Sequence, residues 1–501
     1  MPDRKHIKDD DVDNLKEKTA KGVEWGFIDN LGGTGILAVV NLVLARLLTP
    51  QEFGIVGMTS IFITLSTSLV DSGFTGALTR KKTVDEKDLN TVFHFNLLTS
   101  VILYLILFFT APLIAGFFRQ PVLTEIVRIL GLSLIVTALS IVQKVILVRK
   151  LDFRTQAIVS VISALAGGSA GILMAVAGFG VWSLVVMQLS RLVLTTLLLW
   201  VFSRWLPSFM FSMASFREMF SFGGRLLLTA IISTLWSEIY SFIIGKVYAP
   251  SVLGQYSRAD KFRNMVTSNV SIVMQRVTYP VLASISDDRQ RQKRAYRKIL
   301  RTTVLISFTA VLGLASISEA FVLTLVGEQW IPAIGYLRIL CLSGLFVPLM
   351  ICSANILNAN GRSDTTLRLE IMKTALAVIP VLAGIYISME ALLWSAVAVS
   401  ALSYLVYAAM VSRHVGYSVA SQLKDIFPFL LVSLVMAAVV YCISYVPLPQ
   451  WAVLLLQLVT GAAVVIFAYE RIYPAGEYGD VRQALLKMFR NRRRGSGGDI
   501  E

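Results

Sequence analysis

Long apolar runs separated by short polar turns fill almost the whole 501-residue chain. A helix that crosses a bilayer needs about 20 mostly apolar residues, and the runs have that length. The pattern predicts two groups of six spanning helices, followed by two more spans outside the groups. The predicted spans are 22–48, 53–76, 90–115, 122–147, 156–178, 180–203, 216–247, 252–284, 299–325, 334–358, 366–388, 390–412, 425–446 and 451–470.

A proline–glycine motif occurs twice, with its second copy 200 residues after the first. Pro50 and Gly54 form the first copy, and Pro250 and Gly254 form the second. Each copy follows one long apolar run and precedes another. We therefore interpret each as the tight turn of a transmembrane hairpin, where proline ends one helix and glycine lets the chain bend back.

A second pair of similar segments supports this internal repeat. The segment Arg128–Ser133 is similar to Arg338–Ser343, 210 positions later. Two tandem halves that run in the same direction are the signature of a parallel-repeat transporter fold. The predicted parts are a cytoplasmic segment at 1–20, six-helix lobes at 21–211 and 212–412, two accessory helices at 413–470 and a basic tail at 471–501.

The composition agrees with an all-α polytopic membrane protein. Hydrophobic residues make up 55% of the chain and charged residues 15%, and the mean hydropathy is +0.70. Soluble domains typically carry about 25% charged residues. The three cysteines lie in apolar runs without metal-ligand spacing, so we interpret them as small core residues.

The net charge of +15 follows from topology. Most lysines and arginines lie in alternate turns and in both terminal segments, and the opposite turns are nearly free of them. The positive-inside rule then predicts that both termini are cytoplasmic. Nucleic-acid binding is not needed to explain the charge. The basic loop at 286–301 and the tail could also bind anionic lipid headgroups or a cytoplasmic partner.

No pattern in the chain indicates an enzyme. The three histidines are far apart, and neither a nucleotide-binding loop nor a nucleophile elbow is present. Ionisable residues inside the membrane are the functional candidates by default. Basic residues exceed acidic ones among them, which suits an anionic substrate.

The seventh predicted helix holds the most informative group of these residues. Steps of about 100° per residue place Arg225, Trp236, Tyr240 and Lys246 within one sector of the helix. Shifting by 200 positions places Asp29 and Arg46 on the repeat-equivalent face of the first helix. The predicted substrate-binding residues are Arg225, Arg46, Lys246, Trp236, Tyr240, Arg128, Arg338 and Arg276, and the ion-coupling candidates are Asp29, Glu238 and Asp71.

Each candidate also has a structural interpretation. Arg46 and Lys246 could reach the outer interface with their charged ends. Arg128 could pair with Glu125 one turn away. Asp29 could be held in a salt bridge to a neighbouring helix instead of binding a cation. The charged cluster from Arg258 to Arg263 is expected to lie at the interface or at the mouth of a cavity.

At several points the chain resembles the Wzx-type polysaccharide flippases, most closely their WzxC-like branch. These belong to the multidrug/oligosaccharidyl-lipid/polysaccharide exporter superfamily. The similarity extends over residues 15–470. The segments that carry it are 22–26, 45–54, 253–259, 279–288 and 358–362.

The resemblance implies two six-helix lobes around a central cavity that opens alternately to either side. It also implies a substrate, a polyprenyl-diphosphate-linked oligosaccharide that moves from the cytoplasmic to the periplasmic leaflet of a bacterial inner membrane. Membrane lipids and the polysaccharide polymerase and assembly machinery are the expected partners. No cofactor is expected beyond coupling to H⁺ or Na⁺.

Four other functions compete with this hypothesis. A MATE-like cation or drug antiporter would have twelve helices and an acidic cavity, whereas this chain has two more spans and a basic excess. A fourteen-span major-facilitator transporter would show a long central loop. A membrane-embedded glycan polymerase would need a large outer loop with catalytic residues. A scaffold within an assembly complex would not explain the charges inside the membrane.

Overall fold

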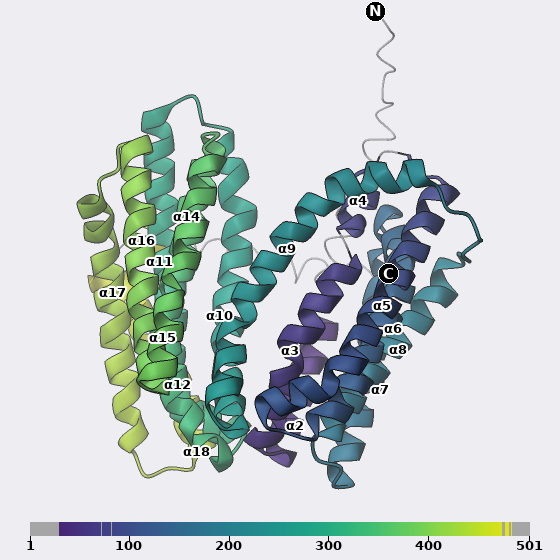
Figure 1. Ribbon diagram of the computed structural model, residues 1–501. Coiled ribbons are helices and arrows are strands. Elements are labelled where there is room, and N and C mark those ends of the chain that lie inside the picture. The colour runs from purple at the N-terminus through teal and green to yellow at the C-terminus, as the bar shows by residue number, and fades with distance from the viewer. Residues whose placement is uncertain (1–29, 72, 82, 473–475, 480–481, 483–501) are drawn as a thin grey trace, which may run out of the picture. The chain divides into compact units, whose positions relative to one another are not determined.

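The computed structural model describes the chain except residues 1–29, 72, 82, 473–475, 480–481 and 483–501. The side chains of residues 30–31, 221–222, 225–226, 276–277 and 472 also lie outside the description. The described residues form helices joined by turns, and they divide into two compact units (Figure 1). Unit 1 is Met1–Gly254, and unit 2 is Gln255–Glu501.

Unit 1 contains the helices of the first half of the chain. In chain order they are η1 (Asn30–Thr34), α2 (Gly35–Leu47), α3 (Pro50–Asp71), α4 (Phe74–Arg80), α5 (Glu86–Phe118), α6 (Leu123–Arg149), α7 (Phe153–Val176), α8 (Trp182–Ser203), α9 (Met213–Val247) and the first turn of α10 (Pro250–Ala283).

Unit 2 contains the rest of α10 and all later helices. These are α11 (Arg289–Leu325), η2 (Glu328–Trp330), α12 (Ile331–Gly344), α13 (Phe346–Ala359), α14 (Ser363–Leu376), α15 (Val378–Tyr386), α16 (Met389–Val415), α17 (Val419–Cys442), η3 (Ile443–Tyr445), α18 (Gln450–Phe467) and η4 (Ala468–Ile472).

These helices account for the predicted spans one by one. Twelve stretches of the described residues are long and apolar enough to cross a membrane. The other two predicted spans correspond to α2 and α10. The apolar part of α2 is shorter in the described residues, Gly32–Leu47, and α10 carries four charged residues in its first four turns. The prediction did not include the short helix α4.

Two predicted spans are each divided into a pair of helices, and proline explains where. A helical proline clashes with the carbonyl group four residues earlier. Pro348 in α13 lies four residues after Gly344, where α12 ends. Pro380 in α15 lies four residues after Leu376, where α14 ends.

The proline–glycine repeat has a different role from the one predicted. Pro50 and Pro250 are the first residues of α3 and α10, where a missing N–H costs nothing. Gly54 and Gly254 lie inside these helices, so neither forms the turn. A Cβ atom on Gly54 would lie 1.7 Å from the Pro250 carbonyl oxygen, and one on Gly254 would lie 1.8 Å from that of Pro50. The glycines let the two helix starts touch.

The core of unit 1 gathers near the start of α5. Phe74, Phe93 and Trp205 are buried there together with side chains of α6 and α9. Trp205 also donates a hydrogen bond from its indole nitrogen to Glu86, at 2.9 Å. This cluster holds the segment between α8 and α9 against α5, and so sets the position where α9 begins.

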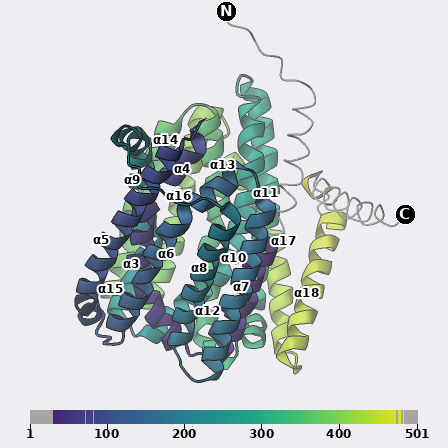
Figure 2. The same ribbon diagram turned by 90° about the vertical axis from the view of Figure 1, so that its right-hand side faces the viewer.

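Helix α11 is the centre of unit 2. It packs against α12, α13, α17 and α18, and Figure 2 shows the last two side by side. More than half of the residues in the most apolar stretch of α11 are buried. In the most apolar stretch of Gln450–Arg471, which includes α18, only 17% are buried. The accessory helices thus attach to unit 2 through α11 and leave most of α18 exposed.

Candidate functional site

One side of α9 is used for packing inside unit 1. On this side Glu238 accepts a hydrogen bond from the Ser60 hydroxyl of α3 at 2.7 Å. One turn earlier, the Thr234 hydroxyl lies 3.3 Å from that of Ser68. One turn later, Phe242 stacks against the aromatic rings at the end of α5. Residues four positions apart share a helix face, so this face is committed to α3 and α5.

The opposite side of α9 carries the aromatic candidates. Trp236 lies two residues after Thr234, and Tyr240 two after Glu238, which is about 200° around the helix in each case. Both side chains are half-buried. Arg225 precedes Trp236 by eleven residues, or about three turns. Its position on the continuous helix is therefore on the same side, although its side chain lies outside the description.

The amino-terminal end of α9 is held by an ion-pair network. The Lys81 ammonium lies 2.9 Å from Asp88 and 3.0 Å from Glu218 of α9. The hydrogen bond to Asp88, helped by Glu218, raises the pKa of Lys81 above its ordinary value. This network and the Phe74 cluster fix the rotation of α9 about its own axis.

The structure places Lys246 against a neighbouring helix. Its Nζ donates a hydrogen bond to the Phe117 carbonyl oxygen at 2.7 Å and lies 3.9 Å from the centre of the Phe117 ring. A cation at the carboxyl end of α5 also interacts favourably with the helix dipole. Lys246 is thus anchored to α5. Arg46 lies in the last turn of α2 with an exposed side chain.

Arg128 and Arg338 make matching contacts in the two units. The Arg128 Nε donates to the Phe108 carbonyl oxygen at 3.3 Å, and the guanidinium carbon lies 4.4 Å from the centre of the same ring. The Arg338 Nε donates to the Ser318 hydroxyl at 2.9 Å. Each arginine reaches a residue 20 positions earlier, on the preceding long helix.

Arg338 also forms an ion pair with the preceding long helix. Its guanidinium lies 3.0 Å from the Glu319 carboxylate. The two arginines therefore join adjacent helices within their own units. This geometry favours a structural role over substrate binding for both of them.

The remaining candidates are Asp71, Arg276 and Asp29. Asp71 ends α3, and its carboxylate accepts hydrogen bonds from the backbone N–H and the hydroxyl of Thr75, so it connects α3 to α4. Arg276 lies on α10, but its side chain is outside the description. Asp29 lies outside the described residues altogether.

Arg258, from the cluster expected at the interface or at a cavity mouth, is buried against the protein, with only 4% of the residue exposed. Its guanidinium carbon lies 4.9 Å from the centre of the Trp330 ring in η2. Arg263, from the same predicted cluster, pairs with Asp260 at 2.6 Å. Stacking on an aromatic ring makes burial of a guanidinium tolerable.

The hydroxyl groups of α3 that face α9 were not predicted as part of a site. Ser60 lies opposite Glu238 and Ser68 lies opposite Thr234. Both belong to a short series of serine and threonine residues in the apolar helix α3, which carries no distinctive spacing. Only the contacts between α3 and α9 reveal them. A carboxylate that accepts a hydrogen bond inside a membrane protein can exchange a proton, which suits an ion-coupling role.

The comparisons with known proteins bear on the whole chain. Residues 43–335 match the family described as "Polysaccharide biosynthesis protein". The chain is 24% identical over 483 residues to the teichuronic acid biosynthesis protein TuaB of Bacillus subtilis, covering 94% of this chain and 99% of TuaB. It is 25% identical over 373 residues to the lipopolysaccharide biosynthesis protein WzxC of Escherichia coli, covering 74% and 76%.

Among solved structures, the chain resembles the lipid II flippase MurJ in an inward closed conformation. The TM-score is 0.74 at 15% identity, and the match covers 90% of this chain and 99% of MurJ. This shows the fold, which MurJ shares with the MATE transporters, and confirms the predicted all-α polytopic class. The family match spans more than half of the sequence, and we conclude that this chain belongs to the polysaccharide biosynthesis protein family, a Wzx-like family of membrane transporters.

Proposed function

We propose that this protein moves a polyprenyl-diphosphate-linked oligosaccharide from the cytoplasmic to the periplasmic leaflet by alternating access. Membership of the family supplies the general function, transport in polysaccharide biosynthesis. The specific substrate is the one that the resemblance to Wzx-type flippases implies, and the residues of the α9 face suit it. A diphosphate–sugar head needs cationic donors for its oxyanions and aromatic surfaces for its sugar rings.

The observation that carries this proposal is the division of α9 into two faces. Packing against α3 and α5 uses Thr234, Glu238 and Phe242. The opposite side bears Trp236 and Tyr240, with Arg225 at the corresponding helical position. Aromatic residues on this side do not take part in the packing against α3 and α5 described above, which supports a role in ligand contact.

The direct test is transport in proteoliposomes with a labelled polyprenyl-diphosphate oligosaccharide. We expect Arg225→Ala to lower the translocation rate about ten- to a hundredfold, because a hydrogen bond to a charged group contributes roughly 1.5–3 kcal/mol. Arg217→Ala is the matched control, since it removes the same side chain from the exposed start of α9. Gel-filtration profiles check that both variants fold.

Each outcome of this experiment has a distinct meaning. Equal transport by Arg225→Ala and the wild type would remove Arg225 from the substrate site while keeping the transport function. Loss of transport in Arg217→Ala as well would show a general effect of charge. If the wild type moves a cationic dye instead of the oligosaccharide, the antiporter alternative replaces the proposal.

We also propose where the protein resides and which residue couples transport to an ion gradient. The protein would reside in a bacterial inner membrane with both termini in the cytoplasm and would deliver its substrate to the polymerase and assembly machinery. Glu238, with its hydroxyl partner on α3, is the ion-coupling residue that the contacts support best. Asp71 supports coupling less well, because its carboxylate already joins α3 to α4.

A further inference from the structure

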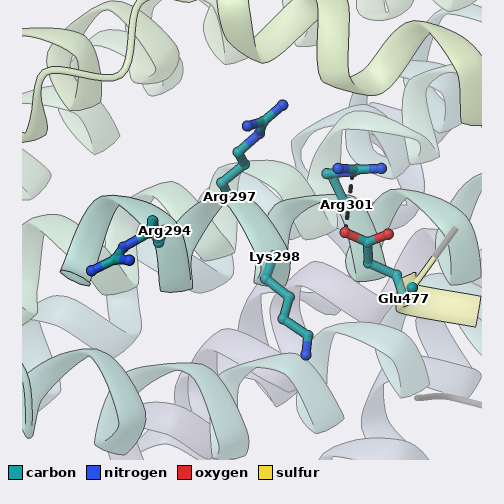
Figure 3. A pocket seen from close by; sticks show the side chains of 6 residues that line it. Arg294, Arg297, Lys298, Arg301 and Glu477 are labelled. Atoms are coloured by element: carbon teal, nitrogen blue, oxygen red, sulfur yellow. Dashed lines mark ion pairs between the residues drawn. The ribbon is translucent and has the colours of Figure 1, made fainter. Parts of the chain in front are cut away.

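The amino-terminal part of α11 carries a stripe of four cationic side chains. Arg294, Arg297, Lys298 and Arg301 occupy positions i, i+3, i+4 and i+7, which all lie on one helix face. They line a cavity of about 400 Å³, which Gly476 and Glu477 complete. Figure 3 shows the side chains of Arg297 and Lys298 leaving the helix in different directions, with the Arg301–Glu477 pair beside them.

Aromatic stacking supports the segment that contributes Gly476 and Glu477 to the cavity. Tyr478 stacks on Tyr469 of η4 with ring centres 5.6 Å apart, and Tyr469 packs against Phe429 of α17 with ring centres 6.0 Å apart. Tyr469 and Phe429 are buried. This stack helps to hold the segment 476–479, which carries Glu477, beside α11.

Two of the four cations are held in place by acidic partners. Arg297 makes a two-point pair with Asp425, with nitrogen–oxygen distances of 2.6 and 2.7 Å. Asp425 also accepts a hydrogen bond from the Tyr417 hydroxyl. Arg301 lies 3.2 Å from the Glu477 carboxylate. These pairs orient the guanidinium groups in advance, so an incoming anion need not order them.

The lining contains four cations and one carboxylate, so the cavity carries an excess of positive charge. Glu477 is itself an anionic group within the cavity, with only 8% of the residue exposed. It shows that the cavity accommodates a carboxylate beside Arg301. A phosphate oxyanion is the stronger partner for a planar guanidinium, because two N–H groups can bind two of its oxygens.

The position along α11 indicates where such a phosphate would come from. At 37 residues, α11 is about 55 Å long, which exceeds the roughly 30 Å hydrocarbon core of a bilayer. The basic residues end at Arg301, and the apolar part of the helix begins at Val304. The stripe therefore lies at the level of the lipid headgroups.

We propose that the cavity beside Arg294, Arg297, Lys298 and Arg301 is a binding site for the phosphate of an anionic phospholipid headgroup, with Glu477 as an internal competitor. The site is separate from the α9 face and does not depend on which substrate is transported. A soluble phosphate or diphosphate would present the same chemistry, and the experiment distinguishes the two sources.

The test measures the unfolding midpoint of the full-length protein in a neutral detergent during titration. The probes are short-chain phosphatidylglycerol, phosphatidylcholine with the same chains, and inorganic diphosphate. We expect phosphatidylglycerol to raise the midpoint with saturation and phosphatidylcholine to leave it unchanged. Saturable stabilisation by diphosphate alone would assign the site to a soluble anion, and no stabilisation by either anion would overturn the proposal.

Matched variants separate a built site from general surface charge. Arg294→Gln combined with Lys298→Gln should weaken phosphatidylglycerol binding about tenfold, because two exposed charge contacts of up to about 1 kcal/mol each are lost. Arg291→Gln combined with Lys293→Gln removes the same charge from residues of the same helix that do not line the cavity. Equal weakening by both pairs would overturn the proposal.

A third variant is expected to act in the opposite direction. Glu477→Gln removes the internal competitor and leaves Arg301 in place, so the apparent affinity should rise about threefold. A decrease in affinity would show that Glu477 positions Arg301 for the phosphate, which would contradict the proposed competition.

Discussion

Gly54 and Gly254 lie where two helix starts touch, and neither position has room for a Cβ atom. Gly54 and Gly254 were recognised because they recur with proline at the same spacing. The hairpin interpretation placed them in turns, whereas both lie in the second turn of a helix. Their shared requirement is the absence of a Cβ atom, since each would meet a backbone carbonyl group that cannot move aside.

We expect Gly54→Ala and Gly254→Ala each to destabilise the protein by about 1–3 kcal/mol, which is typical of overpacking a close contact. The measurement is the thermal unfolding midpoint in detergent. Gly116→Ala in α5 is the control, because a Cβ atom there meets nothing within 4 Å. Unchanged midpoints in both repeat variants would mean that α3 and α10 do not approach so closely.

Glu238 allows a test of ion coupling without loss of its hydrogen bond. In Glu238→Gln the amide oxygen still accepts from Ser60, but the side chain no longer exchanges a proton. We expect the variant to keep its unfolding midpoint and to lose most of the stimulation of transport by a pH gradient. Stimulation equal to that of the wild type would exclude Glu238 as the coupling residue. A wild type that ignores the gradient would exclude proton coupling itself.

Helix pairs within each unit are joined by a repeated arginine contact. Arg128 joins α6 to α5, and Arg338 joins α12 to α11, each through an atom 20 residues earlier. The repeat in the sequence thus conserves a contact between elements. Both arginines also lie over an aromatic ring, Phe108 for Arg128 and Tyr441 for Arg338. The polar partners differ, because Arg128 donates to a carbonyl group, whereas Arg338 donates to a hydroxyl and pairs with a carboxylate.

This difference predicts unequal sensitivity to substitution. Arg338→Gln loses a partly exposed ion pair, which costs about 0.2–1 kcal/mol, and leaves Glu319 without this cation. Adding Glu319→Gln should restore part of the stability, and unfolding midpoints of the single and double variants measure the coupling. If the double variant is as unstable as the sum of the single ones, Arg338 and Glu319 do not interact.

The whole molecule has an orientation that the charge pattern predicts. The turn near Ser388 is predicted to face outward, and the loop near Ser286 is predicted to face the cytoplasm. In a Cys442→Ser background, which removes the one exposed cysteine among the described residues, Ser388→Cys should react with a membrane-impermeant maleimide in spheroplasts. Ser286→Cys should react only after lysis, and the reverse result would invert the topology.

Contacts divide the chain at Gly254, so α9 belongs with the first unit in the structure. The repeat in the sequence places the corresponding boundary near residue 212. The two boundaries differ because the repeat is defined by similar sequence segments, whereas a unit is defined by which helices pack together. The lobe boundaries predicted from the repeat stay a prediction.

The sequence by itself determined the spans, their order in two halves, the excess of basic charge and the resemblance to the family. These properties are local, because about twenty apolar residues and a few flanking lysines or arginines define a span without reference to other helices. The breaks in two spans coincide with Pro348 and Pro380, but Pro112, Pro280 and Pro428 lie inside continuous helices, so a proline alone does not predict a break.

Only the tertiary structure decided what the individual polar residues contact. Gly54 lies against the carbonyl group of Pro250, which is 196 positions later in the sequence. Ser60 donates a hydrogen bond to Glu238 on α9, and Arg258 lies over the ring of Trp330. The phosphate cavity likewise needs α11 and the segment near Glu477 side by side. Contacts between distant segments depend on how helices rotate and pack, and hydropathy does not specify that rotation.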